Sequence, residues 1–309
     1  MRKVIGIGET ILDIIFKNGQ PTKALPGGSV FNAMISLGRI GIPVHFITEV
    51  GQDQVGERVL SFMRENNLST ENVDIFCEGK SPVSLAFLND KNEAKYMFYT
   101  QYPENRLNVV WPRIDADDIL ILGSYYAVNP ALRPRIIEFL EYARERKAII
   151  YYDPNFRRAH AHETMRITPF LLENLEYADI VRGSEEDFET LFQLSDPDKI
   201  YADKIKFYCS NFIYTRGAEG IELFSPGIHT HFDVPEIKTV STIGAGDNFN
   251  AGLLYGLLKG NITRGQLENL SLEKWSEIIS VGIDFSTEVC CSYDNYISPE
   301  FASKYTAIH

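Results

Sequence analysis

The sequence predicts an α/β fold in which helices cover both faces of a mostly parallel sheet. Short apolar runs rich in β-branched residues, typical of strands buried on both faces, alternate with longer segments of helical periodicity. This alternation favours parallel strands joined by crossover helices. The chain has 309 residues, 44% hydrophobic and 23% charged, which is enough to bury a core without disulfides. Length alone allows one or two domains. Because no Pro/Gly-rich linker and no internal repeat divides the chain, we expect one domain over residues 1–309.

The expected elements follow one another in a regular order. Strands are expected at residues 4–7, 44–47, 119–122, 148–152, 180–181 and 212–215, with an antiparallel return strand at 221–225. Helices are expected at residues 30–40, 55–66, 133–146, 169–175 and 185–192. Gly41 stands just past the first helix, where a left-handed glycine commonly ends a helix.

Two hairpins interrupt the alternation. Residues 11–16 and 22–25 flank Asn18-Gly19, a strong signal for a tight hairpin turn. Residues 83–88 and 94–100 flank a polar loop at 89–93. The two hairpins, inserted at about 11–25 and 83–100, are expected to form a small separate sheet. That sheet would cover a site as a lid or pair with another subunit; the alternative is an edge extension of the main sheet.

Charge and cysteine content exclude several classes of protein. The 30 Lys and Arg against 42 Asp and Glu give a net charge of −12, which argues against a nucleic-acid partner but leaves small anions possible. The four cysteines form no C-x-x-C pair, and two of them, Cys290 and Cys291, are adjacent. This pattern suits neither zinc nor a disulfide framework. No signal-peptide core or membrane-spanning run is found, so we expect a soluble, cytoplasmic protein that does not bind membranes.

The sharpest motif is Gly244-Ala245-Gly246-Asp247, which leads into an apolar helical segment. Small residues let the backbone approach a ligand, and the helix start offers unpaired N–H groups to an anion. A carboxylate would repel that anion, so Asp247 is better explained as the base that takes a proton from a hydroxyl during phosphoryl transfer. The alternative is an ordinary capped helix start.

A second motif is Gly27-Gly28-Ser29 with Asn32 one helical turn later. The glycines allow a tight approach, Ser29 is expected to cap the helix, and Asn32 can donate to and accept from a polyol. Asp13, at the end of an apolar run, is placed to accept from sugar hydroxyls. For these residues the alternatives are an ordinary turn with an N-cap and a carboxylate at a strand end.

Further polar residues follow strand ends, where ligands of open α/β sheets bind. Asn155 and Arg157 follow one strand and are assigned to the substrate; Thr215, Gly217 and Gly220 follow another. The acids at 185–187 open a helix and either orient Mg²⁺ through water or complement the helix dipole. A dinucleotide fingerprint is excluded because Ile11 replaces its third glycine, and no P-loop motif occurs.

Together these motifs resemble the ribokinase-like, or PfkB, carbohydrate kinase family over nearly the whole chain. Residues 27–41 are similar to its first signature and residues 242–252 to its second, which is highly specific. Gly51-x-Asp53-x-x-Gly56 and Asp153-Pro154-Asn155 also recur in the family. The start at residues 8–13, residues 81–87 and residues 153–157 look most like fructokinases and are also similar to 2-keto-3-deoxygluconate kinases.

The resemblance implies a three-layer αβα fold with a small β lid, which is often a dimer contact. It implies transfer of the γ-phosphoryl group from Mg²⁺ and ATP to a primary hydroxyl of a small sugar, fructose or a related ketose. By motif, the base is Asp247 and the anion hole is Gly244, Ala245 and Gly246. The sugar-binding positions are Asp13, Gly27, Gly28 and Asn32, and the nucleotide edge is Thr215, Gly217 and Gly220.

The sequence departs from the family pattern at three places. Ser241 and Ile243 replace the usual Asp and Thr, and the loop at 289–294 lacks the usual Arg and Gly. Activation by a monovalent cation is therefore expected to be weak or absent. The family's Asn-x-x-Glu appears as Ser184 to Asp187, which assigns Ser184 to the nucleotide and either Glu186 or Asp187 to Mg²⁺. The alternatives are a kinase for another polyol, a sugar acid or a nucleoside, or a sugar- or nucleotide-binding protein without turnover.

Overall fold

The computed structural model describes residues 2–88 and 94–305. Its strands are β1 (Val4–Ile7), β2 (Ile11–Lys17), β3 (Gln20–Gly27), β4 (Val44–Gly51), β5 (Val73–Phe76), β6 (Lys80–Leu88), β7 (Ala94–Gln101), β8 (Ile119–Gly123), β9 (Ile149–Asp153), β10 (Ile180–Ser184), β11 (Phe212–Thr215), β12 (Ile221–Ser225) and β13 (Ile228–Phe232). Its helices are α1 (Ser29–Arg39), α2 (Gln54–Glu65), α3 (Arg133–Glu145), α4 (Thr164–Tyr177), α5 (Glu185–Phe192), α6 (Pro197–Ile200), α7 (Ala245–Lys259), α8 (Leu272–Cys290) and α9 (Pro299–Ala302).

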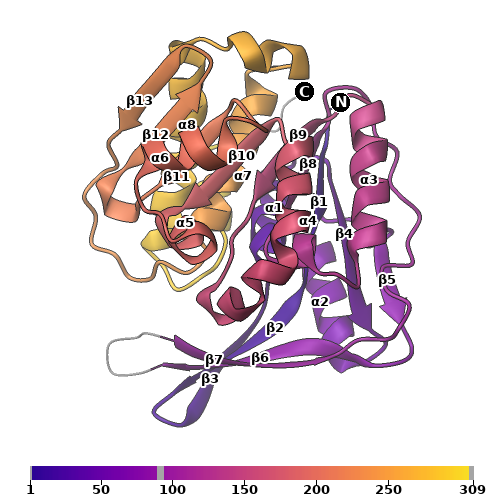
Figure 1. Cartoon of the computed structure of the whole chain (residues 1–309). Coiled ribbons are helices and arrows are strands. Elements are labelled where there is room, and N and C mark those ends of the chain that lie inside the picture. Colours follow the sequence, from indigo (N-terminus) through magenta and orange to yellow (C-terminus); the bar gives the residue numbers. More distant parts are fainter. Residues whose placement is uncertain (1, 89–93, 306–309) are drawn as a thin grey trace.

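Among the described residues the strands form two sheets, one of nine strands and one of four. The large sheet has the order β13-β12-β11-β10-β9-β8-β1-β4-β5. Its strands run parallel from β11 to β5, and β12 and β13 join one edge as antiparallel strands. Figure 1 shows helices on both sides of this sheet. The predicted α/β class with a mostly parallel sheet is therefore confirmed.

Alternate residues of the central strands belong to two separate cores. Val4 faces the core formed with α1, α2, α7 and α8, whereas Ile5 faces the core formed with α3, α4 and α5. The same alternation holds for Ile121 and Leu122 on β8. Because both faces are buried, these strands are almost continuously apolar, and this is the pattern that identified them in the sequence.

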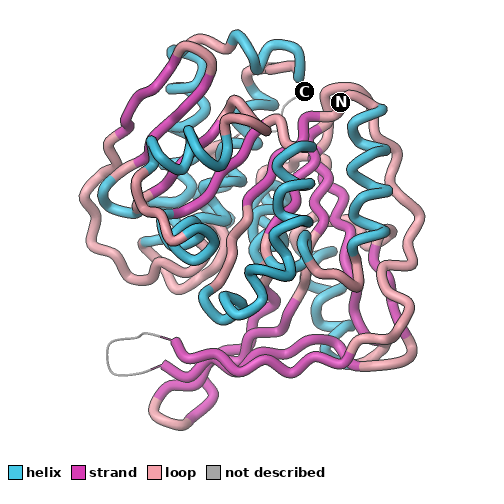
Figure 2. Tube along the Cα trace, in the orientation of Figure 1, coloured by secondary structure: helices cyan, strands magenta, loops and turns pink. Residues whose placement is uncertain are grey.

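The four-stranded sheet has the order β3-β2-β6-β7 and projects from the large one (Figures 1 and 2). Asn18 and Gly19 both have positive φ, 52° and 73°, as a two-residue turn between β2 and β3 requires. The expected separate sheet is therefore confirmed, and its hairpins extend slightly beyond the expected bounds. The expected polar loop at 89–93 lies outside the described residues.

Two local expectations were wrong. Ser29 does not cap α1: the N-cap is Gly28, and no side chain caps it. Pro169 does not begin a helix but lies inside α4, which starts at Thr164. Proline removes one backbone donor from the helix, and Thr168 Oγ1 donates to Thr164 O at 2.7 Å in the same turn.

Other elements were not predicted from the sequence, namely β5, β13, the short helices α6 and α9, and the long helix α8. Gly41 does end α1 with φ 80°. Within residues 2–88 and 94–305, no helix has both the length and the apolar character needed to cross a membrane.

Candidate active site

The glycine motif forms a tight turn that opens α7. Gly244 is left-handed, with φ 79°, and a Cβ there would lie 2.7 Å from the carbonyl oxygen of Asn295. The Ala245 N–H donates to Thr242 O at 3.2 Å. In the described part of the chain, the next two N–H groups, of Gly246 and Asp247, have no acceptor. These amides carry the positive end of the helix dipole and form a site for an anion.

Asp247 is buried in the first turn of α7. Its Oδ2 accepts from Asn32 Nδ2 at 2.8 Å, and its Oδ1 accepts from Asn155 Nδ2 at 3.3 Å. Burial raises the pKa of Asp247 to about 6, although the bond from Asn32 and the charge of Arg157 favour the ionised form. Asp247 is therefore an ionised carboxylate at neutral pH whose proton affinity is above that of an ordinary carboxylate.

Asp13 lies at the start of the small sheet and contacts both a serine and a glycine. Ser84, on the neighbouring strand β6, donates its hydroxyl to Asp13 Oδ1. A Cβ at Gly27 would lie 2.6 Å from Asp13 Oδ2. Burial raises the pKa of Asp13 to about 6, opposed by Ser84 and by the charge of Arg157.

Gly28 connects this region to α1. Its φ is 134°, and a Cβ at this position would overlap the carbonyl oxygen of Glu9. The turn places Asn32 in the first turn of α1, 4% exposed. Asn32 Oδ1 is buried without a hydrogen-bond partner among the described residues. A substrate hydroxyl would satisfy this acceptor.

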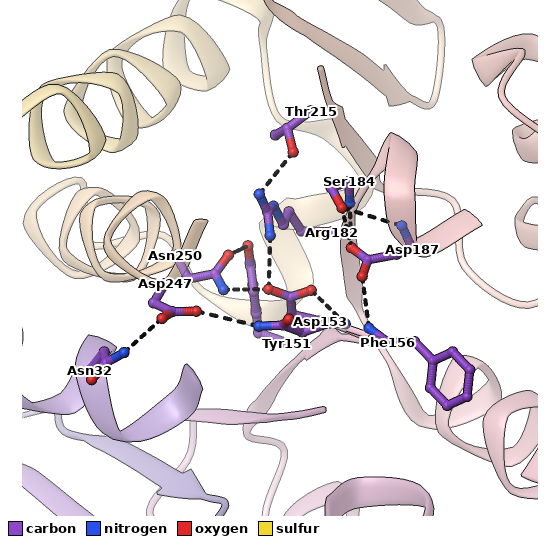
Figure 3. Close-up of polar contacts among 11 residues, drawn as sticks. Asn32, Tyr151, Asp153, Phe156, Arg182, Ser184, Asp187, Thr215, Asp247 and Asn250 are labelled. Atoms are coloured by element: carbon purple, nitrogen blue, oxygen red, sulfur yellow. Dashed lines mark hydrogen bonds and ion pairs between the residues drawn. The ribbon is translucent and has the colours of Figure 1, made fainter. Parts of the chain in front are cut away.

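A buried ion pair lies near Asp247 (Figure 3). Arg182 Nη1 contacts Asp153 Oδ2 at 3.0 Å, and Nη2 donates to Thr215 Oγ1 at 2.8 Å. Asn250 Nδ2 donates to the same Asp153 oxygen at 2.6 Å. Sequence reasoning did not find Arg182 or Asn250. A charged residue directly after Ile180 and Val181 was the one available signal for Arg182.

The expected nucleotide edge is more open. Gly217 is exposed, with φ 54°, and a Cβ there would meet nothing within 4 Å. Gly220 is buried, and a Cβ there would lie 2.5 Å from Phe232 O. Thr215 ends β11 and bonds to Arg182, and Ser184 caps α5.

The acids at the start of α5 differ in their surroundings. Asp187 is buried; one oxygen accepts from the Phe156 N–H at 2.7 Å and the other from Ser184. Burial and the charge of Asp153 raise the pKa of Asp187. Glu186 has an exposed carboxylate 3.7 Å from the Arg158 guanidinium. No group of three or more His, Cys, Asp or Glu within the described ranges could hold a metal ion.

The structure thus brings most of the expected residues together, though they come from distant parts of the chain. Asn32 and Asp247, which are hydrogen-bonded, are 215 residues apart. The exposed Arg157 lies close enough for its charge to act on Asp13 and Asp247. Within the described residues the arrangement combines a buried carboxylate, a buried amide oxygen without a partner and two N–H groups without an acceptor. Groups of these kinds suit phosphoryl transfer to a hydroxyl.

Comparison with known proteins identifies the family of this chain. The model of the family described as pfkB family carbohydrate kinase matches residues 1–273. A fructokinase of Rhizobium leguminosarum bv. trifolii is 27% identical over 276 residues, covering 86% of this chain and 83% of that protein. A 5-dehydro-2-deoxygluconokinase 1 of Bacillus cereus is 25% identical over 248 residues, covering 76% of this chain and 74% of that protein.

A solved structure is similar over nearly the whole length. It is a double mutant of the fructokinase of Vibrio cholerae O395 in a form with fructose, ADP and potassium ion bound. Its TM-score is 0.82 at 17% identity, covering 99% of this chain and 98% of that one. This likeness supports the three-layer ribokinase-like fold.

Proposed function

The chain belongs to the pfkB family of carbohydrate kinases, and we propose that it transfers the γ-phosphoryl group of ATP to a primary hydroxyl of fructose or a related ketose. Family membership makes it an ATP-dependent sugar kinase. The assignment of the individual residues is our proposal, and the observation that carries it is the position of Asp247. Its carboxylate lies in the same helical turn as the two free N–H groups.

In the proposed reaction Asp247 accepts the proton of the attacking hydroxyl. Asn32 and Asn155 each donate to one of its oxygens and so fix the orientation of the carboxylate. The amides of Gly246 and Asp247 would hold the negative charge of the transferring phosphoryl group. Positioning and charge stabilisation are the main requirements of phosphoryl transfer, and the residues around α7 supply both.

The sugar is proposed to bind between Asp13 and Asp247. Asp13, Gly27, Gly28, Asn32, Asn155 and Arg157 surround this position, and the unpartnered Asn32 Oδ1 is available to a hydroxyl. The fructokinase relative supports a ketose. A second candidate substrate is a sugar acid. Arg157 is exposed and has no ion pair within the described residues, so its guanidinium is available to a substrate carboxylate. A 5-dehydro-2-deoxygluconokinase is also a relative.

A coupled ADP-release assay over ketoses, aldoses, sugar acids and nucleosides tests the assignment. We expect the highest kcat/KM with fructose or a related ketose. Higher kcat/KM with a sugar acid than with any ketose would favour the second candidate. Turnover on no compound would instead favour a binding protein without catalytic activity.

Mg²⁺ is proposed to enter with ATP and to rely on few protein ligands. Mg²⁺ commonly uses one or two carboxylates together with substrate phosphates and water. Both oxygens of Asp187 already accept hydrogen bonds, whereas the Glu186 carboxylate is exposed. We therefore assign the water-mediated contact to Glu186, with Ser184, Thr215, Gly217 and Gly220 along the nucleotide. When bound, Mg²⁺ would neutralise phosphate charge.

Activation by K⁺ is expected to be weak or absent. Ser241 and Ile243 stand where many family members carry Asp and Thr, and the exposed segment at 242–243 adds no carboxylate. Replacing Na⁺ by K⁺ in the assay should leave the rate almost unchanged. A several-fold increase would contradict this expectation.

We also propose that the small sheet is a lid and a homodimer contact. Cross-strand register places Ile14, Leu85 and Met97 in one row, and the exposed Phe87 and Tyr99 lie on the same face. Apolar exposure of this kind is typical of an interface. Met97→Asp should then convert a dimer to a monomer in light scattering.

The protein is also proposed to be cytoplasmic. ATP as the phosphoryl donor and the free cysteines support this location.

A further inference from the structure

Arg182 extends from β10 to the underside of the glycine turn. Its side chain is buried, and a Cβ on Gly246 would lie 3.0 Å from both Nη1 and Nη2. The guanidinium therefore packs directly against the backbone whose N–H groups open α7. Its Nε has no hydrogen-bond partner in the part of the chain that the structure describes. A buried arginine this close to an anion site places a positive charge behind the amides.

Asp153, the ion-pair partner of Arg182, is linked to Asp247 by two routes. Asp153 Oδ1 accepts from the Asn155 N–H at 3.1 Å, and the Asn155 side chain donates to Asp247. Asp153 Oδ2 accepts from Asn250, which lies one turn after Asp247 on α7. Asn250 is held in turn by the Tyr151 hydroxyl at 2.8 Å. Asp153 thus contacts both the loop and the helix that carry or bind Asp247.

Arg182 offsets part of the negative charge around Asp247. Asp247, Asp153 and Asp187 are three buried carboxylates, and Arg182 is the buried cation among them. Arg157 supplies a second positive charge from the surface, while Asn32 and Asn155 are neutral donors. Burial lowers the pKa of Arg182, but the nearby Asp153, Tyr151 and Asp187 together outweigh burial, and the pKa of Arg182 is raised. Arg182 stays charged throughout the range in which Asp247 titrates.

We propose that Arg182 is a positioning residue for phosphoryl transfer. Through Asp153 it holds the carboxylate of Asp247 in place, and through its contact with Gly246 it keeps positive charge behind the amides that receive the phosphoryl group. The inference rests on the proposed role of Asp247 as the base. It adds a residue pair, Arg182 and Asp153, that contacts neither the sugar-binding glycines nor Asn32.

The test measures kcat, the KM for sugar and the pH dependence of kcat at saturating sugar with Mg²⁺ and ATP, so that a change in sugar affinity does not enter the profile. Arg182→Met should lower kcat by roughly 10- to 100-fold, because the support of a base is lost, and should change the sugar KM less than about threefold. Arg182→Lys keeps the charge but cannot contact Asp153 and Thr215 at the same time. Its kcat should therefore lie between those of Arg182→Met and the wild type. Asp153→Asn leaves Arg182 unneutralised and should move the acid limb of the profile down by roughly 0.5 to 1 pH unit. The double variant Arg182→Met/Asp153→Asn should return the limb to its wild-type position.

Arg133→Met is the matched control for loss of a buried arginine. Arg133 is also 6% exposed and bonds to Glu173, Asn174 and Ala127 O, away from α7. It should lower the melting temperature without moving the acid limb. Two results would overturn the inference. One is an acid limb that stays at its wild-type pH in both Asp153→Asn and the double variant. The other is a kcat for Arg182→Met within twofold of the wild-type value. If the wild-type profile shows no acid limb near pH 6, the role of Asp247 itself fails, which is a different result.

Discussion

The two sides of the candidate site are built differently. On the proposed sugar side, Asn32 of α1 and Asn155 after β9 both donate to Asp247. Asp13 of β2 accepts from Ser84 of β6. On the nucleotide side, Gly217 is exposed with open space around it, and residues 242–243 are exposed. Side chains with fixed partners distinguish one arrangement of hydroxyls from another, whereas backbone amides bind any phosphate. From this contrast we expect selectivity to reside on the proposed sugar side.

Asp247 lies where the two sides meet, so its substitution should have the largest effect. Asp247→Asn removes the base and should lower kcat by at least about 100-fold, with little change in sugar KM. Steady-state kinetics with the preferred sugar provides the measurement. Turnover close to that of the wild type would contradict the assigned role.

The same variant separates activity from stability. Because burial raises the pKa of Asp247 to about 6, protonation stabilises the folded state, and this stabilisation is lost as the pH rises through about 6. At pH 7 the variant, whose Asn is neutral, should therefore be more stable than the wild type by on the order of 1 kcal/mol. Thermal unfolding of both proteins at pH 7 and pH 5 checks this. The difference in melting temperature between Asp247→Asn and the wild type should be smaller at pH 5.

Gly28→Ala should have the next largest effect, on folding and on sugar binding together. An added Cβ would overlap Glu9 O, and φ 134° is unfavourable for alanine. We expect a loss of about 2–3 kcal/mol in the free energy of unfolding. Gly227→Ala is the control: its φ is 75°, but a Cβ meets nothing within 4 Å, so only about 1 kcal/mol should be lost. Equal losses in urea unfolding would show that contact with Glu9 is unimportant.

Asp13→Asn tests the sugar side without disturbing the backbone. It replaces a charged acceptor by a neutral one, so the sugar KM should rise roughly 10- to 30-fold while the ATP KM is unchanged. Because burial raises the pKa of Asp13 to about 6, wild-type sugar affinity should weaken as the pH falls below about 6. The variant should lose this pH dependence. A rise in both KM values would remove the distinction between the two sides.

The sequence predicts local features of this site well and long-range ones poorly. The Asn18-Gly19 turn and the glycine start of α7 follow from backbone conformations that few other residues adopt. Arg182 was missed because a charge after two apolar residues indicates the end of a strand, and its partner Asp153 is 29 residues away. A buried arginine is stable only with that partner, and no local pattern contains both.

Pro169 led to a similar error for the same reason. Proline is favoured at a helix start, so the local pattern placed the beginning of α4 there. In the structure the helix continues on its N-terminal side to Thr164, and Ile167 is buried in the core. Packing of that residue outweighs the lost backbone donor, and packing depends on residues that are distant in the sequence.

Gly217→Ala should have the smallest effect and bears most directly on the contrast between the two sides. A methyl group at this exposed position meets no protein atom within 4 Å, so only the left-handed φ of 54° opposes it. We expect the ATP KM to rise roughly two- to fivefold, a change of about 1 kcal/mol or less, with the sugar KM unchanged. Gly220→Ala is the matched variant, since its Cβ would lie 2.5 Å from Phe232 O, and it should raise the ATP KM further. If Gly217→Ala raised the ATP KM more than about 20-fold, the nucleotide itself would have to fill the space beside Gly217. The nucleotide side would then be as closely shaped as the sugar side, and selectivity would be shared between them.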